Sequence, residues 1–236
     1  MKTIFKKHFL YWGLPSLFVS ITMLVYFFNI LGLAFIIAPE ANREFGLIEN
    51  VQLIIILSIF IIAFKALKIE KVNFKKYVFI AFTLLSIFMF LEEIDYGAHI
   101  VDYYHGRSWK HVLRESGDHE IINFHNQGKR LHYIKLSAYI SFVLFLVIVP
   151  AIIRKVKTAN KYLNWLTPSK YFIYTLISMG VLNRIALLID KKIEHSSITS
   201  LHKNVSEFEE IFIYYIMFLY IYELVYQNVF LKEKEV

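Results

Sequence analysis

The chain has 236 residues, of which 57% are hydrophobic and 17% aromatic, and its mean hydropathy is +0.50. This composition excludes an ordinary soluble domain, which carries more charge and fewer apolar residues. The absence of cysteine excludes a disulfide, a thiol nucleophile and a cysteine-ligated metal.

Six apolar stretches approach or exceed the ~20 residues that a membrane-spanning helix requires. They cover residues 11–37, 51–67, 77–91, 133–153, 171–189 and 211–230. The third is short unless it continues through 92–96. The basic start of the chain resembles a signal peptide, but no small-residue cleavage site follows, so we interpret 11–37 as a retained helix. The sequence predicts an all-α, polytopic membrane helix bundle forming one domain over residues 1–236.

The placement of Lys and Arg predicts the orientation of this bundle. The net charge is +7, and most basic residues lie at the two chain ends and after the second and fourth apolar stretches. Such short basic segments stay in the cytoplasm, which places both termini there. The pattern favours the lipid bilayer as partner and argues against nucleic acid. We expect a multi-pass protein of the bacterial cell membrane.

The longest connection between apolar stretches, residues 96–131, faces outward in this orientation. It contains most of the histidines. Connections of this length within a compact protein are usually functional or disordered. Tyr103, Tyr104 and Trp109 suit the membrane interface, so we expect the segment to lie against the outer surface. In an enzyme, residues 102–120 would act as a lid.

Candidate catalytic residues begin where the third apolar stretch ends. At ~100° per residue, Glu92, Asp95, His99 and Asp102 share one face of a continuing helix. Acids and imidazole on one face suit acid–base chemistry or half of a metal site. Glu93 points toward a different neighbour. The alternative is that carboxylates at an outer helix end are simply solvated, an interpretation we prefer for Asp102.

A second polar group precedes the fourth apolar stretch. Asn126 is a candidate for substrate binding, and His125 and His132 join His99 as candidate ligands of a divalent metal such as zinc. The spacing matches no standard zinc or di-iron motif, because neither His-Glu-x-x-His nor His-x-x-x-His occurs. The metal prediction therefore rests on composition.

The fifth and sixth apolar stretches add the remaining candidates. Arg184 lies within the fifth and should face the bundle and have a partner, because an unpaired charge in a membrane is costly. Glu207 and Glu210 share a face at the start of the sixth and are its candidate partners. With Asn183 they could bind a substrate, Arg184 holding an anionic group. A purely structural Arg–Glu pair is an equally good interpretation.

The segment 90–99, Phe-Leu-Glu-Glu-Ile-Asp-Tyr-Gly-Ala-His, resembles a bacterial multi-pass membrane family with Glu-Glu-Ile-Ser-Trp-Gly-Gln-Arg at a helix end. That family continues with an Asn/Gln-Gly stretch and Leu-His-Asn, which correspond here to 126–128 and 131–132. Ser, Trp, Gln and Arg of the family motif are replaced by Asp95, Tyr96, Ala98 and His99. The resemblance supports the choice of residues and implies no reaction. The alkaline ceramidase and adiponectin-receptor superfamily is similar in its His and Asp zinc ligands, but its closing His-x-x-x-His is absent here.

Three functions remain open. The first is an enzyme, a hydrolase or transferase acting on a lipid or lipid-linked substrate at the outer leaflet, with Glu92 or Glu93 as general base or metal ligand. The second is a transporter or a protein that binds an ion or small solute. The third is a non-catalytic envelope or immunity protein. Substrate and oligomeric state are not determined by the sequence.

Overall fold

The computed structural model describes residues 6–38, 46–94, 129–156, 160–193, 205 and 207–231, without the side chains of 129–132, 134, 135, 193 and 227–231. Within these ranges the chain is helical and has no strand, which confirms the all-α prediction. The elements are η1 Phe9–Gly13, α2 Leu14–Phe27, η2 Ile30–Gly32, α3 Ala34–Ile37, α4 Leu47–Ile69, α5 Asn73–Glu93, α8 Lys129–Phe142, η5 Val143–Ile148, α9 Val149–Val156, α10 Lys161–Leu166, α11 Phe172–Ile193 and α12 Glu207–Leu231.

Among the described residues, five helical segments are long and apolar enough to cross a membrane. They are 6–27, 47–69, 73–93, 136–156 and 172–192. Their outward faces carry large apolar side chains such as Leu84, Phe145 and Leu188, each more than 60% exposed. A surface of this kind is stable against lipid rather than water. The chain is therefore a multi-pass helical membrane protein.

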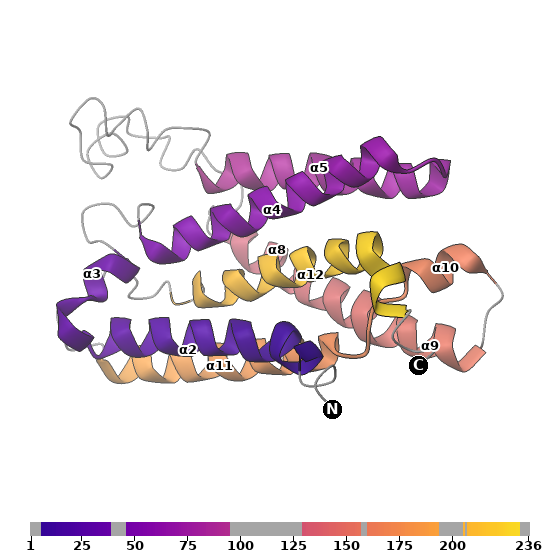
Figure 1. Cartoon of the computed structure of the whole chain (residues 1–236). Coiled ribbons are helices and arrows are strands. Elements are labelled where there is room, and N and C mark those ends of the chain that lie inside the picture. The colour runs from indigo at the N-terminus through magenta and orange to yellow at the C-terminus, as the bar shows by residue number, and fades with distance from the viewer. Residues whose placement is uncertain are drawn as a thin grey trace, which may run out of the picture.

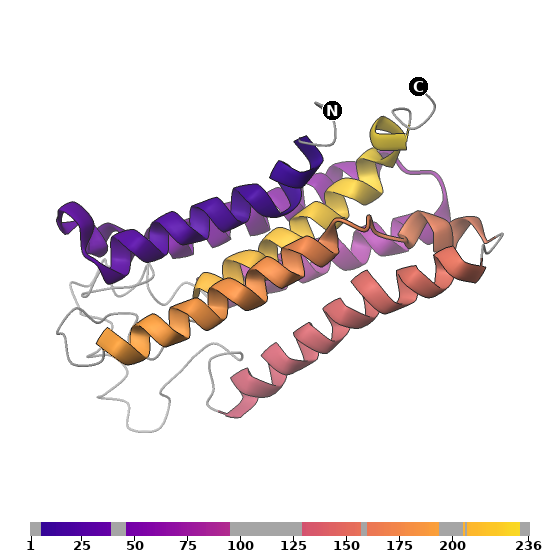
Figure 2. The same cartoon turned by 90° about the horizontal axis from the view of Figure 1, so that it is seen from below.

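The predicted sixth stretch forms α12, which differs from the other five because three acidic residues occupy its first turn. It lies at the centre of the bundle, where it packs against α4, α11 and α2 (Figure 1). α5 packs against α4, and the continuous helix α8–η5–α9 lies at the side of the bundle away from α2, where η5 packs against α11 (Figure 2). The acids of α12 are thus covered by neighbouring helices.

The first apolar stretch is shorter as a helix than the sequence predicts. It ends at Phe27, because Asn29, Leu31 and Gly32 adopt left-handed backbone angles (φ 44°, 56° and 71°) and reverse the chain. The Asn29 side chain then accepts a hydrogen bond from the backbone N–H of Ala34 at 3.2 Å. The prediction of one helix through residue 37 is wrong, since an apolar run shows no sign of a turn made within it.

Proline shapes the start of the same span. Pro15 has no N–H to donate to the carbonyl of Tyr11 one turn earlier, and the preceding turn, η1, is π-helical. The Thr175 hydroxyl of α11 donates to that carbonyl at 2.8 Å. The Tyr215 hydroxyl of α12 donates to the neighbouring carbonyl of Leu10 at 2.5 Å. These two backbone carbonyls therefore accept hydrogen bonds from side chains of α11 and α12. The bonds connect the three helices and satisfy the carbonyls away from water.

The two ends of the bundle differ in charge. At the end that carries the α4–α5 connection, α9, α10 and the start of η1, the described basic residues are Lys6, Lys7, Lys65, Lys68, Lys71, Lys75, Lys76, Arg154, Lys155, Lys161 and Lys170. The described acids there are Glu70 and Glu223. We name this the basic end and the opposite one the outer end. The positive-inside rule predicts that the basic end faces the cytoplasm, and this orientation stays a prediction.

Candidate functional site

The start of α4, the end of α5 and the start of α12 meet at the outer end of the bundle (Figure 1). The Gln52 side chain of α4 donates from Nε2 to the backbone carbonyl of Glu207 at 3.3 Å. The Tyr214 hydroxyl of α12 donates to Glu93 Oε1 of α5. These two contacts tie three separate spans together at one level.

Glutamates gather at this junction. Among the described residues, six at the outer end are buried, each less than 10% exposed: Glu49, Glu92, Glu93, Glu207, Glu209 and Glu210. We name them the outer glutamate cluster. Each has an interaction partner. Burying carboxyl groups together is costly, because ionised groups lose hydration and repel one another. A concentration of such groups in a membrane protein is typical of a functional site.

Helix dipoles explain only part of the cluster. Glu49 lies in the first turn of α4, and Glu207, Glu209 and Glu210 lie in the first turn of α12. Negative charge is stabilised there by about 0.3–1 kcal/mol. Glu92 and Glu93 are the last two residues of α5, where the same dipole opposes negative charge. Their position has no dipole explanation, and this makes them the stronger functional candidates.

Tyr214 connects these two groups of acids. Its phenol donates to Glu93 and lies close enough to Glu207 and Glu210 to be affected by their charge. Glu207, Glu210 and Tyr214 follow one another at i, i+3 and i+7, so they share one face of α12. That face points toward the end of α5. The arrangement places a proton donor between carboxyl groups from two helices.

Gln52 adds a polar atom with no partner. Its side chain is fully buried, with 0% exposure. Its Nε2 is satisfied by Glu207, but Oε1 lacks a hydrogen-bond partner among the described residues. A buried unpaired acceptor costs about 1–3 kcal/mol. A buried acceptor of this kind suits a proton donor or a cation.

The structure separates Arg184 from this site. The buried residues of α11, Phe172, Thr175, Met179 and Ala186, form one stripe, and at ~100° per residue Arg184 points about 150° away from it. Arg184 is accordingly exposed. The prediction that Arg184 faces the bundle is wrong, and its long side chain can extend along α11 toward the interface.

The remaining predicted residues divide into two groups. Glu92, Glu93, Glu207 and Glu210 are buried at the outer end, and Asn183 is half-buried on α11. His99, His125 and Asn126 lie outside the described residues, as does the expected lid, residues 102–120. His132 lies in α8, without a described side chain. Within the described part of the chain, no group of three His, Asp or Glu residues could hold a metal ion.

Sequence reasoning missed Glu49, Glu209 and Tyr214, and it did not include Gln52 among the candidate site residues. The i, i+3 spacing of Glu49 and Gln52, at the start of an apolar run, was a signal that could have identified them. Tyr214 gave no such signal, because tyrosine is common throughout this chain.

No family model matches the chain, and neither a curated protein nor a solved structure is significantly similar to it. The resemblance of segment 90–99 to a bacterial membrane family stays a prediction.

Proposed function

We propose that this protein is an integral membrane enzyme of the bacterial cell membrane. In this proposal the outer glutamate cluster performs acid–base chemistry on a lipid or lipid-linked substrate at the outer leaflet. The observation that supports it most directly is the hydrogen bond from Tyr214 to Glu93, made between two spans beside Glu207 and Glu210. An acid–base group must be held in position beside its substrate, and this bond holds the Glu93 carboxyl group from a second span.

Two carboxyl groups can supply both proton transfers of a hydrolysis or transfer reaction. One carboxylate takes the proton from the attacking water or hydroxyl as the new bond forms. A neighbouring protonated carboxyl group gives a proton to the leaving oxygen as the old bond breaks. We assign these two roles to Glu93 and Glu92, and Tyr214 orients Glu93. Such proton transfer contributes ~10²- to 10⁴-fold in rate.

Vesicles test this proposal. The purified chain is reconstituted with a lipid extract of the membranes in which it is expressed, and lipid species are followed by mass spectrometry. We expect the wild type to convert at least one species and Glu93→Gln to lower that rate at least ~100-fold. An identical lipid composition with wild type and Glu93→Gln contradicts the proposal.

The matched control is a second buried tyrosine–glutamate pair at the basic end. Glu223 accepts hydrogen bonds from the Tyr11 hydroxyl and from the backbone N–H of Ser169, the latter at 3.0 Å. It is 8% exposed, close to the 9% of Glu93. Glu223→Gln removes a buried charge from the same chemical setting, far from the outer end. The rate per folded protein should stay within about twofold of the wild type.

A metal-dependent form of the enzyme is a further part of the proposal. His99, His125 and His132 would supply the nitrogen ligands of a divalent metal such as zinc, which would activate water. Metal content of the purified protein, compared with His99→Ala and His132→Ala, tests this form. Stoichiometric metal that is lost in both variants supports it, and equal metal content in all three proteins contradicts it.

Cation or solute binding is the second candidate function. The unpartnered Oε1 of Gln52 favours it, because amide oxygens are among the ligands that hard cations prefer. Under this alternative, Ca²⁺ or Mg²⁺ raises the melting temperature of the wild type but not that of Gln52→Met. A shift that is equal in both proteins contradicts it. Turnover of a lipid with no cation-dependent shift favours the enzyme.

A further inference from the structure

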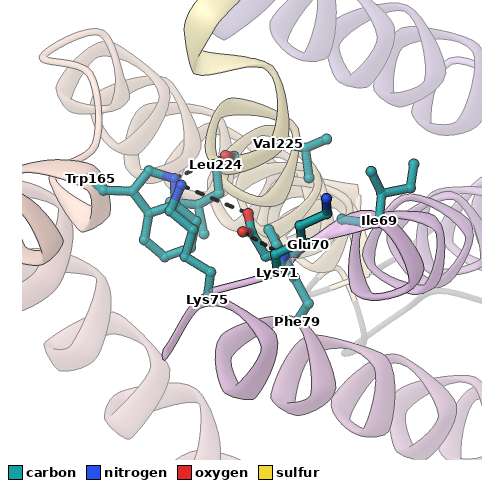
Figure 3. Close-up of a pocket in the computed structure, with 9 residues that line it drawn as sticks. Ile69, Glu70, Lys71, Lys75, Phe79, Trp165, Leu224 and Val225 are labelled. Atoms are coloured by element: carbon teal, nitrogen blue, oxygen red, sulfur yellow. Dashed lines mark hydrogen bonds and ion pairs between the residues drawn. The ribbon is translucent and has the colours of Figure 1, made fainter. Parts of the chain in front are cut away.

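A cavity of about 360 Å³ lies at the basic end, remote from the outer glutamate cluster (Figure 3). It is enclosed by the α4–α5 connection, α10 and the last turns of α12. Ala66, Phe79 and Leu224 provide apolar lining, whereas Lys71 and Lys75 provide positive charge. The cavity is therefore amphipathic, and its size is within the range of pockets that bind small ligands.

The charges of this pocket are arranged around Glu70. One carboxylate oxygen of Glu70 accepts the backbone N–H groups of Lys71 and Val72, both at 3.0 Å. The other lies 3.8 Å from Lys75 Nζ. Glu70 is thus held by its own loop, and the two lysines leave the lining with a net charge of +1. The net positive charge of the lining favours the binding of an anion.

Trp165 forms one wall of the pocket and is fixed in place. Its Nε1 donates to the carbonyl of Leu224 at 3.2 Å, which connects α10 to α12. Lys75 Nζ lies 5.0 Å from the centre of the indole ring, at cation–π distance. Tryptophan at a helix end is typical of the membrane–water interface, where its ring sits at the level of lipid headgroups. The pocket therefore lies at headgroup depth.

The surroundings favour a lipid over a soluble anion. Ile69, which also lines the pocket, is 78% exposed, and Tyr77 on the adjoining turn of α5 is 69% exposed. Apolar surface beside a basic pocket at this depth suits acyl chains. Basic pockets between transmembrane helices on the cytoplasmic side bind anionic headgroups. Inorganic phosphate would use the lysines but leave the apolar lining unfilled.

We propose that this pocket binds the phosphate headgroup of an anionic phospholipid of the inner leaflet. Lys71 and Lys75 contact the phosphate, and Trp165 packs against the glycerol region. The site is independent of the outer glutamate cluster and of its proposed chemistry. A lipid held here stabilises the junction of α4, α5, α10 and α12, because it binds the folded state.

The test compares melting temperatures of the full chain in detergent with added phosphatidylglycerol, phosphatidylcholine or inorganic phosphate. We expect phosphatidylglycerol alone to raise the melting temperature, and the double variant Lys71→Ala, Lys75→Ala to lose most of that shift. The matched control is Lys191→Ala with Lys192→Ala, which removes two exposed lysines from the other end of the bundle. The control should keep the wild-type shift. An equal shift with phosphate alone, no shift, or equal loss in both double variants overturns the proposal.

A second measurement covers the case in which the pocket variant does not fold. Trp12 and Trp109 are replaced by Phe so that Trp165 is the remaining tryptophan. Its fluorescence is recorded in mixed vesicles whose phosphatidylglycerol or phosphatidylcholine carries brominated acyl chains. At equal mole fractions, we expect brominated phosphatidylglycerol to quench Trp165 at least twice as strongly. Equal quenching by the two lipids overturns the proposal.

Discussion

The hydroxyl of Tyr214 on α12 donates a hydrogen bond to the carboxyl group of Glu93, the last residue of α5. The two residues lie 121 positions apart in the chain. The bond brings the end of one span to the first turns of another, where Glu207 and Glu210 are buried. It is the structural basis for regarding these glutamates as one site.

Removing this bond should destabilise the protein measurably. Tyr214→Phe leaves Glu93 buried without its phenol donor, and the expected loss in free energy of unfolding is about 1–3 kcal/mol. The measurement is equilibrium denaturation in detergent. Tyr77→Phe is the control, because Tyr77 is 69% exposed and should change stability by less than about 0.5 kcal/mol. Equal effects of the two substitutions would show that the bond contributes nothing.

The proline-released carbonyl of Tyr11 gives a second prediction. Thr175→Val keeps the shape of the side chain but removes the hydroxyl that donates to this carbonyl, so we expect a loss of about 1–3 kcal/mol. Pro15→Ala restores a backbone N–H at the position one turn later. In the Thr175→Val background it should therefore recover part of the loss, measured by a double-mutant cycle. Strict additivity of the two substitutions contradicts this account.

For Arg184 we predict that substitution leaves the stability of the protein nearly unchanged. Because it is exposed on α11, Arg184→Gln should change the free energy of unfolding by less than about 0.5 kcal/mol. A buried Arg–Glu pair would instead cost about 3–5 kcal/mol when broken. Denaturation of the variant distinguishes the two. A loss of about 3–5 kcal/mol in the free energy of unfolding would show that Arg184 is paired inside the bundle.

Glu70 predicts a pH dependence of stability. Its hydrogen bond from the backbone N–H of Val72, assisted by that from Lys71 and by the charge of Lys75, holds the pKa of the carboxyl group below its usual value. A lowered pKa in the folded state stabilises the protein above the unfolded pKa of about 4.3, and this contribution is lost as pH falls through the folded value. The difference in free energy of unfolding between wild type and Glu70→Gln should be constant from pH 6 to 8, because Glu70 is ionised there in both the folded and the unfolded state.

The same difference should shrink below about pH 4.3, because protonated Glu and Gln are both neutral and similar in shape. Denaturation curves of both proteins across this range provide the measurement. A difference that grows as the pH falls has the wrong sign and contradicts the hydrogen-bonding of Glu70 seen here.

Composition was sufficient to predict the fold class, whereas the orientation inferred from charge placement stays a prediction. Five stretches recur as helices of spanning length, and the third extends through Glu93, as a full span requires. The end of the first helix was not predictable from hydropathy, because the reversal at Asn29 to Gly32 uses backbone angles inside an apolar run. Hydropathy measures preference for lipid and carries no information on a turn.

The site was predicted in part. Glu92, Glu93, Glu207 and Glu210 could be chosen because acids beside apolar runs are costly. The orientation of Arg184 could also have been predicted, since its position lies opposite the small and apolar residues that α11 buries. The pairing of Tyr214 with Glu93 could not, because it depends on how α5 and α12 pack against α4. That packing is a tertiary property, and no local pattern determines it.

Cross-linking tests the central claim that glutamates from separate spans meet at the outer end. The chain has no cysteine, so Glu93→Cys with Tyr214→Cys introduces the sole reactive pair. A short bifunctional thiol reagent should join the two cysteines in native membranes. The control is Lys75→Cys with Tyr214→Cys, because Lys75 lies at the other end of α5 from Glu93. The control pair should not be joined. Efficient linking of the first pair alone is the predicted result. Failure of the first pair to link, or equal linking of both pairs, would contradict a shared site and with it the proposed acid–base chemistry.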